Sequence, residues 1–164
     1  MNPELHRPIT PERITPHGTD LVIEATAAEC QALADRMLLP GIRAVTCRFH
    51  LVAADDASVM AFGHLTAIVV QTCVVSLDEF EATVEERFKI RFVPSGQETD
   101  DDDPESIDEI PYEGRLIDIG EAVAEQLGLA LDPYPRKPGA ELPSELGAED
   151  SGPFAALAKL KKKT

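Results

Sequence analysis

The stretch from Phe80 to Phe92 constrains the fold most, because its apolar residues recur at every second position. In extended backbone six apolar side chains share one face: Phe80, Ala82, Val84, Phe88, Ile90 and Phe92. Such period-two alternation indicates a half-buried β-strand. The opposite face carries three acids, Glu79, Glu81 and Glu85, and then three bases, Arg87, Lys89 and Arg91. The stretch therefore predicts a sheet with one buried face and one exposed, charged face.

Other segments supply further strands of this sheet. Residues 20–26 read as a first strand, and residues 42–54 alternate again, with Arg48 and His50 among the outward side chains. Residues 59–75 form a long apolar run that predicts a central strand, in which Gly63 is expected to mark a bulge. Short connections between the last three strands predict an antiparallel meander.

Two helices are predicted from their termini. Thr26 and Glu29 form a capping-box pattern before an apolar stripe, and the dipeptide at Pro40 ends that helix. Asp118 is a plausible N-cap for a second helix, which the proline-rich residues 132–138 end. The predicted fold class is α+β: an antiparallel meander, with barrel-like closure left open, and two main helices packed on it.

The rest of the chain divides by composition. Residues 14–135 are expected to form a single domain, residues 136–152 a flexible linker, and residues 153–164 a short basic amphipathic tail. Between Glu98 and Glu113 the chain has nine acids and no base, so Ser95–Glu109 is expected to be a mobile loop.

Charge and composition limit the function classes. The 164 residues carry a net charge of −15, which argues against sequence-independent binding of naked nucleic acid and against a DNA partner. No apolar run is long enough for a membrane span, and the N-terminus lacks the apolar region of a secretory signal. Three cysteines without disulfide-framework spacing favour a reducing cytoplasm. A monomer is expected.

Signals for catalysis are weak. Cys73 ends a strand and could pair with His50 or His64 as a thiol nucleophile, but a small buried hydrophobe is the favoured interpretation of such a cysteine. The histidines and cysteines lack the paired spacing of zinc ligands, and no phosphate loop is present. We therefore expect no catalytic residue, metal or cofactor.

Binding signals are stronger. Arg87, Lys89 and Arg91 would form a compact positive face for an anionic partner, unless they pair with acids of a neighbouring strand. The tail could fold on a partner or dock on its own domain. Its candidate contacts are Phe154, Leu157, Lys159, Lys161, Lys162 and Lys163.

An ordered series of motifs resembles the YceD family, domain-of-unknown-function family 177. The series comprises Cys73 through Phe80, the acidic loop around Asp100–Asp108, residues 116–135 and a closing segment like that of alphaproteobacterial members. Two positions depart from the family: its second cysteine is Ser76 here, and an arginine often found before that cysteine is Val75. A zinc or redox role is therefore not transferred.

The resemblance implies a non-enzymatic factor for accumulation of large-subunit ribosomal RNA. Its expected partner is the precursor large subunit, bound through rRNA, a basic ribosomal protein or both. Two alternatives remain open from the residues: a thiol-dependent enzyme using Cys73, and an acidic holdase for basic proteins.

Overall fold

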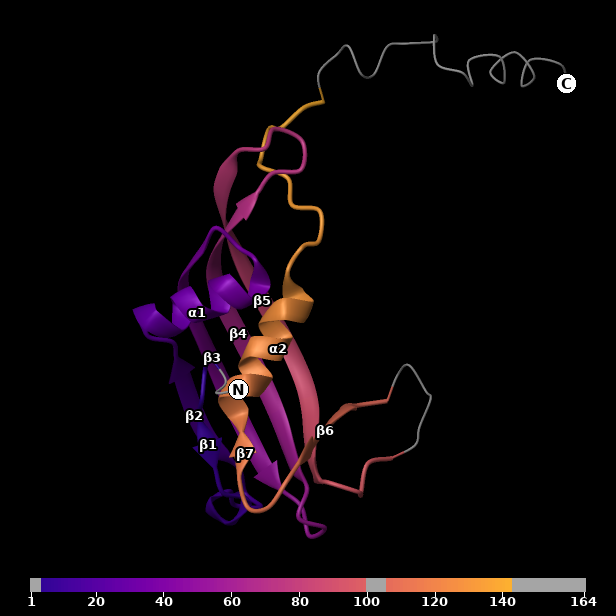
Figure 1. The fold of residues 1–164 in the computed structure, drawn as a ribbon. Coiled ribbons are helices and arrows are strands. Elements are labelled where there is room, and N and C mark those ends of the chain that lie inside the picture. Colours follow the sequence, from indigo (N-terminus) through magenta and orange to yellow (C-terminus); the bar gives the residue numbers. More distant parts are fainter. Residues whose placement is uncertain (1–3, 100–105, 143–164) are drawn as a thin grey trace, which may run out of the picture.

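A computed structural model describes residues 4–99 and 106–142. It contains seven strands, two α-helices and one short 3-10 helix within that part of the chain (Figure 1). The strands are β1 (Pro8–Ile9), β2 (Thr19–Glu24), β3 (Gly41–Ala53), β4 (Val59–Thr72), β5 (Glu79–Pro94), β6 (Asp108–Tyr112) and β7 (Ile117–Asp118). The helices are η1 (Pro11–Arg13), α1 (Ala27–Met37) and α2 (Ile119–Ala130).

The main sheet has five strands in the order β2-β3-β4-β5-β6. Strands β3 to β5 form the predicted antiparallel meander, β2 pairs antiparallel with β3, and the α+β class is confirmed. The sheet does not close into a barrel, because β2 and β6 remain at its two edges.

The acidic stretch contains a strand that the sequence analysis did not predict. Residues 108–112 were expected to belong to a loop, but they form β6, which runs parallel to the last residues of β5. Register places Ile90 beside Asp108 and Pro94 beside Tyr112. The tyrosine hydroxyl donates to the carbonyl of Ala57 at 2.7 Å, which holds β6 against the β3–β4 turn.

Gly63 is not a bulge. It pairs in continuous register with Phe49 on one side and Phe88 on the other, and the irregularity of β3 lies between Ile42 and Ala44 instead. A Cβ atom at Gly63 would lie 2.1 Å from Cζ of Phe88, whose ring meets that of Phe49 edge-on at 5.6 Å. The glycine is thus required because an aromatic ring occupies the space of its side chain.

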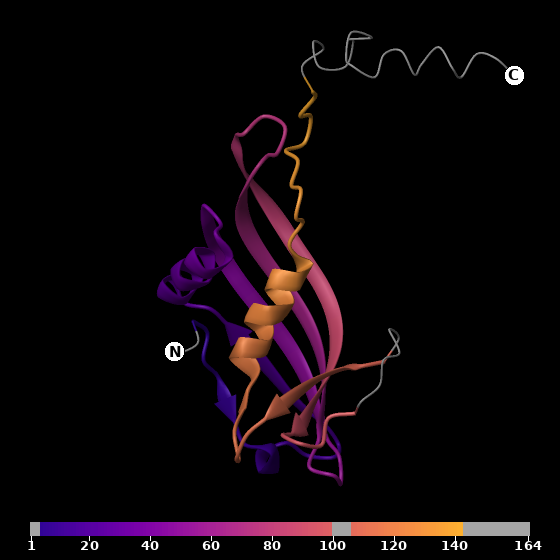
Figure 2. The same ribbon diagram turned by 45° about the vertical axis from the view of Figure 1, so that its right-hand side comes forward.

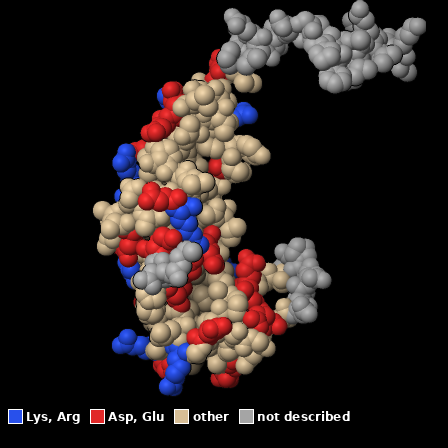
Figure 3. All heavy atoms as spheres, viewed as in Figure 1, with Lys and Arg blue, Asp and Glu red and all other residues tan. Residues whose placement is uncertain are grey.

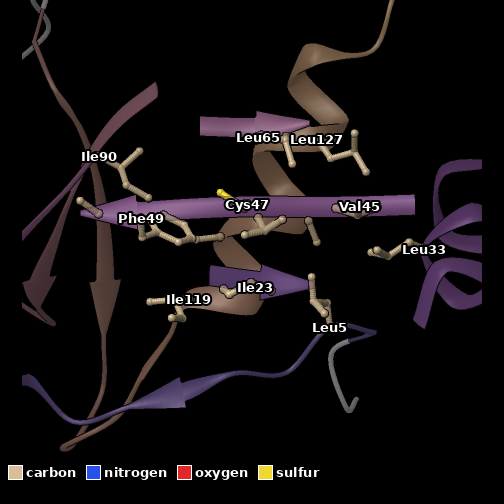
Figure 4. Close-up of a cluster of buried hydrophobic side chains, with 14 of the residues drawn as sticks. Leu5, Ile23, Leu33, Val45, Cys47, Phe49, Leu65, Ile90, Ile119 and Leu127 are labelled. Carbon is tan, nitrogen blue, oxygen red and sulfur yellow. The ribbon is translucent and has the colours of Figure 1, made fainter. Parts of the chain in front are cut away.

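One face of the sheet is covered by α1, α2 and the small β1–β7 sheet (Figures 1 and 2). The buried cluster between these layers includes Val45, Cys47 and Phe49 of β3, Leu33 of α1 and Leu127 of α2 (Figure 4). It is aliphatic, as the composition predicts, and its apolar area is the main stabilising contribution.

The N-terminal residues, expected to be extended, also enter this core. Leu5 is fully buried, and its carbonyl lies where a side chain at Gly120 would have to go. Arg7 donates to both carboxylate oxygens of Glu29, at 2.7 and 2.9 Å. This guanidinium, together with the capping-box bond to Thr26, lowers the pKa of Glu29 to about 2.

Both predicted N-caps are confirmed. Thr26 accepts from the Glu29 N–H, and the Glu29 carboxylate accepts from the Thr26 N–H. Asp118 accepts from the N–H groups of Gly120 and Glu121. Each cap satisfies backbone donors that the first helical turn leaves unpaired.

Candidate functional site: the open face of the sheet

The face of the sheet opposite the helices, here called the open face, carries the side chains that alternate with the core. On β5 this face is formed by the odd-numbered residues from Glu79 to Arg91, while Phe88, Ile90 and Phe92 face the helices. The predicted alternation of β5 is therefore confirmed, and its charged side is exposed.

Along β5 the charge of the open face changes sign. Glu81 pairs with Arg43 of β3 at 3.0 Å, and Glu85 lies 2.8 Å from Nε2 of His64 on β4. The three bases follow in the other half of the strand. The acids pair with side chains of β3 and β4, whereas the three bases differ from one another in their neighbours.

Arg91 is held by carboxylates. Its guanidinium lies 2.6 Å from Asp56 of the β3–β4 turn and 3.5 Å from Glu109 of β6, and its Nε donates to Ser58. The pairing with neighbouring acids that the sequence analysis left open therefore describes this residue. The geometry assigns it a role in joining β6 and the β3–β4 turn to β5.

Arg87 and Lys89 differ from Arg91 in their ion pairing. Within residues 4–99 and 106–142, neither has a carboxylate within ion-pair distance, and the same holds for Arg48 on β3. The ammonium of Lys89 lies 5.6 Å from the ring centroid of Phe62, its cross-strand partner on β4. This distance is typical of a cation–π contact, which leaves the charge available to an anion.

Register gathers these cations with three aromatic rings. Cross-strand neighbours form two adjacent rows on the open face: His50, Phe62 and Lys89 in one, and Arg48, His64 and Arg87 in the other. We call these six residues the open-face cluster. Phe62 is 43% exposed, although it lies on the central strand of the sheet.

The two histidines are fixed by carboxylates at the rim of the cluster. Nδ1 of His50 lies 2.7 Å from Asp20 on β2, and His64 is held by Glu85. The ring of His50 is 6.3 Å from that of Phe62. These pairs orient two flat rings beside the exposed phenyl group, which favours recognition of a planar group over a point charge.

A hollow of about 730 Å³ lies between the two rows. Its floor is the backbone of Leu21, Phe49, Gly63 and Phe88, whose side chains, where present, face the helices. Its walls are the open-face cluster with Asp20 and Val22. A floor of hydrogen-bonded strands makes the hollow part of the rigid sheet.

The helix-covered side has a different charge pattern. There acidic and basic side chains are interspersed and lie next to one another (Figure 3). Arg36 pairs with both Glu4 and Glu121, and Arg7 pairs with Glu29. Arg7 and Arg36 on that side thus join separate parts of the chain, whereas Arg48, Arg87 and Lys89 have no carboxylate partner among the described residues.

Cys73 is fully buried at the start of the β4–β5 turn. Its sulfur accepts from the N–H groups of Val75 and Ser76 at 3.4 Å. The Ser76 hydroxyl and backbone N–H stabilise the thiolate and lower the pKa of Cys73 to about 6. In contrast, burial raises the pKa of Cys47 to about 12.

The arrangement around Cys73 does not bring His50 or His64 to its sulfur. No histidine in the described residues hydrogen bonds its sulfur. His64 precedes the end of β4 by eight residues, or about 27 Å along an extended strand, and His50 pairs with Phe62 still farther away. A Cys73–histidine pair with either residue is therefore excluded by the sheet geometry.

The remaining predicted site residues cannot be placed. Residues 153–164, with Phe154, Leu157 and the terminal lysines, lie outside the described residues, as do the acids at 100–103. In residues 4–99 and 106–142, no three His, Cys, Asp or Glu side chains form a group that could hold a metal ion. None of the helices described is long and apolar enough to cross a bilayer.

Comparison with known families gives one finding. Residues 62–161 match the family described as "Large ribosomal RNA subunit accumulation protein YceD". The match begins at Phe62 and includes most of β4 and all of β5, β6, β7 and α2. Neither a curated protein nor a solved structure matches the chain.

Proposed function

The chain belongs to the YceD family, and from this membership we propose that it promotes accumulation of large-subunit ribosomal RNA, without catalysis, by contacting that RNA through the open face. The observation that carries the proposal is the open-face cluster. Three cations lie there without a carboxylate partner among the described residues, in a chain of net charge −15. Such a concentration of unmatched charge fits an anionic partner.

RNA fits this surface better than a basic ribosomal protein does. Arg48, Arg87 and Lys89 would repel a lysine-rich chain, whereas they can contact phosphates. The overall negative charge opposes binding to arbitrary nucleic acid, so stable contact needs the exposed rings in addition to charge. The acidic-holdase alternative would use other surfaces of the molecule and leave the cluster without a role.

Co-sedimentation with precursor large subunits tests the proposal. The variant Arg48→Gln, Arg87→Gln, Lys89→Gln removes the three unmatched cations and leaves Arg91 in place, because its loss would leave Asp56 and Glu109 unpaired. We expect this variant to move to the top of a sucrose gradient and large-subunit rRNA to fall in cells that rely on it. Its melting temperature should stay within a few degrees of the wild type, since all three side chains are exposed.

The matched control is Arg13→Gln, Arg115→Gln, Arg136→Gln, which leaves the Arg43–Glu81 pair of the open face intact. These arginines are also exposed and lie outside the cluster, so the change in net charge is the same. We expect the control to co-sediment normally. If the open-face variant still travels with precursor large subunits, the open face is not the contact surface.

A further inference from the structure

The hollow on the open face suggests which form of RNA is bound. We propose that it accepts an unpaired base of single-stranded RNA, stacked on Phe62, with the flanking phosphates on Arg48, Arg87 and Lys89. This inference rests on the proposed function and adds the ligand class of the site.

The spacing of the cations suits a single extended strand. Arg87 and Lys89 are alternate residues of β5, so their Cα atoms lie about 6.8 Å apart, close to the separation of successive phosphates along a nucleic-acid strand. Arg48 lies two strands away, across His64, at about 9.6 Å from Arg87. Cations thus stand on two sides of the hollow, and a base between them would have its own phosphates within reach.

Phe62 supplies the stacking surface. Phe62 is 43% exposed, whereas His64, two residues along the same strand, is paired with Glu85. Lys89 now lies over the phenyl ring at 5.6 Å, and it can turn to a phosphate when a base takes its place. The hollow extends over the backbone of Gly63, next to the ring, and gives such a base room.

Double-stranded RNA fits the cluster less well. Its bases are already stacked inside the helix and leave only sugars, phosphates and groove edges to the protein. The second backbone would also meet the carboxylates at the rim, Asp20 on one side and Glu85 on the other. A single strand can avoid both acids and still place one base in the hollow.

Fluorescence anisotropy with a labelled 12-nucleotide oligouridylate or oligoadenylate, and with a 12-base-pair RNA duplex, tests the inference on the full chain. We expect both single strands to bind more tightly than the duplex, with a log–log salt slope of about −2 from three phosphate contacts. Phe62→Ala should weaken single-strand binding about 5- to 150-fold, the range measured for loss of one base–aromatic stack. Phe62→Leu keeps an apolar side chain and should show a similar loss.

Ile68→Ala is the matched control. It truncates another exposed apolar side chain of β4 on the same face, outside the hollow, and should change the affinity less than twofold. Arg87→Gln should flatten the salt slope by about 0.7, the contribution of one phosphate contact on a single strand.

The outcomes separate the two proposals. If Phe62→Leu binds like the wild type while the triple glutamine variant does not, the base-stacking inference is wrong and the proposed RNA contact stands. Equal affinity for duplex and single strand, or for a polyglutamate peptide, would also overturn the inference. If no RNA binds and the triple variant co-sediments normally, the proposed function fails as well.

Discussion

Gly63 contributes to both faces of the sheet because it has no side chain. On the helix side it leaves space for the ring of Phe88, and on the open side its backbone forms part of the hollow floor. We expect Gly63→Ala to destabilise the protein by about 1–3 kcal/mol, because a new methyl group would displace a ring already packed against Phe49. Urea unfolding measures this change.

Two further variants test whether the ring of Phe88 causes the destabilisation expected for Gly63→Ala. Gly41→Ala adds the same methyl group to β3, where it would meet Val70 at an ordinary 3.7 Å, and should cost less than about 0.5 kcal/mol. In a Phe88→Leu background the penalty of Gly63→Ala should shrink. An undiminished penalty in that background would place the strain in the backbone and not at the ring.

The Cys73 thiol makes stability depend on pH. Its pKa is about 6 in the folded chain, whereas a thiol in an unfolded chain titrates near 8.5. Between these values the unfolded state binds more protons, so stability rises with pH through this window and is lost as pH falls through 6. We expect the melting temperature to increase from pH 6 to pH 8.5, and Cys73→Ala to flatten that increase.

Cys30→Ala is the control for this experiment, because burial raises the pKa of Cys30 and its thiol stays protonated in the same window. It should leave the slope with pH unchanged. A slope that survives in Cys73→Ala would show that other groups produce it.

Strand β5 contributes to both the hydrophobic core and the charged open face. Its helix-facing side chains build the core, its first half carries acids, and its second half carries Arg91 and two cations that have no carboxylate partner among the described residues. The connection to β6 leaves from Thr99 and returns at Ser106, and both residues line a small hollow with Arg91. Thr99 and Ser106, which flank the acidic run in the sequence, thus both lie near Arg91 of β5.

This proximity predicts that the acidic run competes with RNA for the open-face cluster. Changing Asp100–Asp103 to Asn should strengthen binding of the single-stranded oligonucleotide several-fold at low salt, with little difference at high salt, where charges are screened. The control changes four linker acids, Glu141, Glu145, Glu149 and Asp150, to their amides. Equal gains in the two variants would mean that net charge alone matters, and anisotropy distinguishes the two cases.

At the scale of the whole molecule, the described residues form one continuous buried cluster. Within the described residues it extends from Leu5 to Leu127 and joins the sheet, both helices and the N-terminal segment. The apolar stripe of residues 153–164 is too short to add much to such a core, and the lysines of this segment suit RNA phosphates. We propose that the tail acts on the partner.

Deletion of residues 153–164 tests this role. The melting temperature should change by a few degrees at most, equivalent to about 1 kcal/mol, while co-sedimentation with precursor large subunits should be lost. A full-length variant with Lys159, Lys161, Lys162 and Lys163 changed to Gln separates charge from the apolar stripe of Phe154 and Leu157. A large drop in melting temperature on deletion would instead make the tail part of the core.

Local patterns in the sequence were enough to predict the long strands and both α-helices of this protein. Alternation predicted the faces of β3 and β5, and Thr26 and Asp118 predicted where the helices begin, because these signals depend on residues a few positions apart. The order of short motifs also indicated the family, which the match to residues 62–161 confirms.

Which of these residues come into contact depends on long-range strand pairing. Register across two hairpins brings Arg48, Phe62 and Arg87 together, and the parallel β6 brings Glu109 to Arg91. The pairing of β6 depends on a partner strand that precedes it by a dozen or more residues, and no local pattern encodes it. Because ion pairing depends on such long-range neighbours, three bases that look equivalent in the sequence differ in the fold. Arg91 is held by two carboxylates, whereas Arg87 and Lys89 have none within ion-pair distance in residues 4–99 and 106–142.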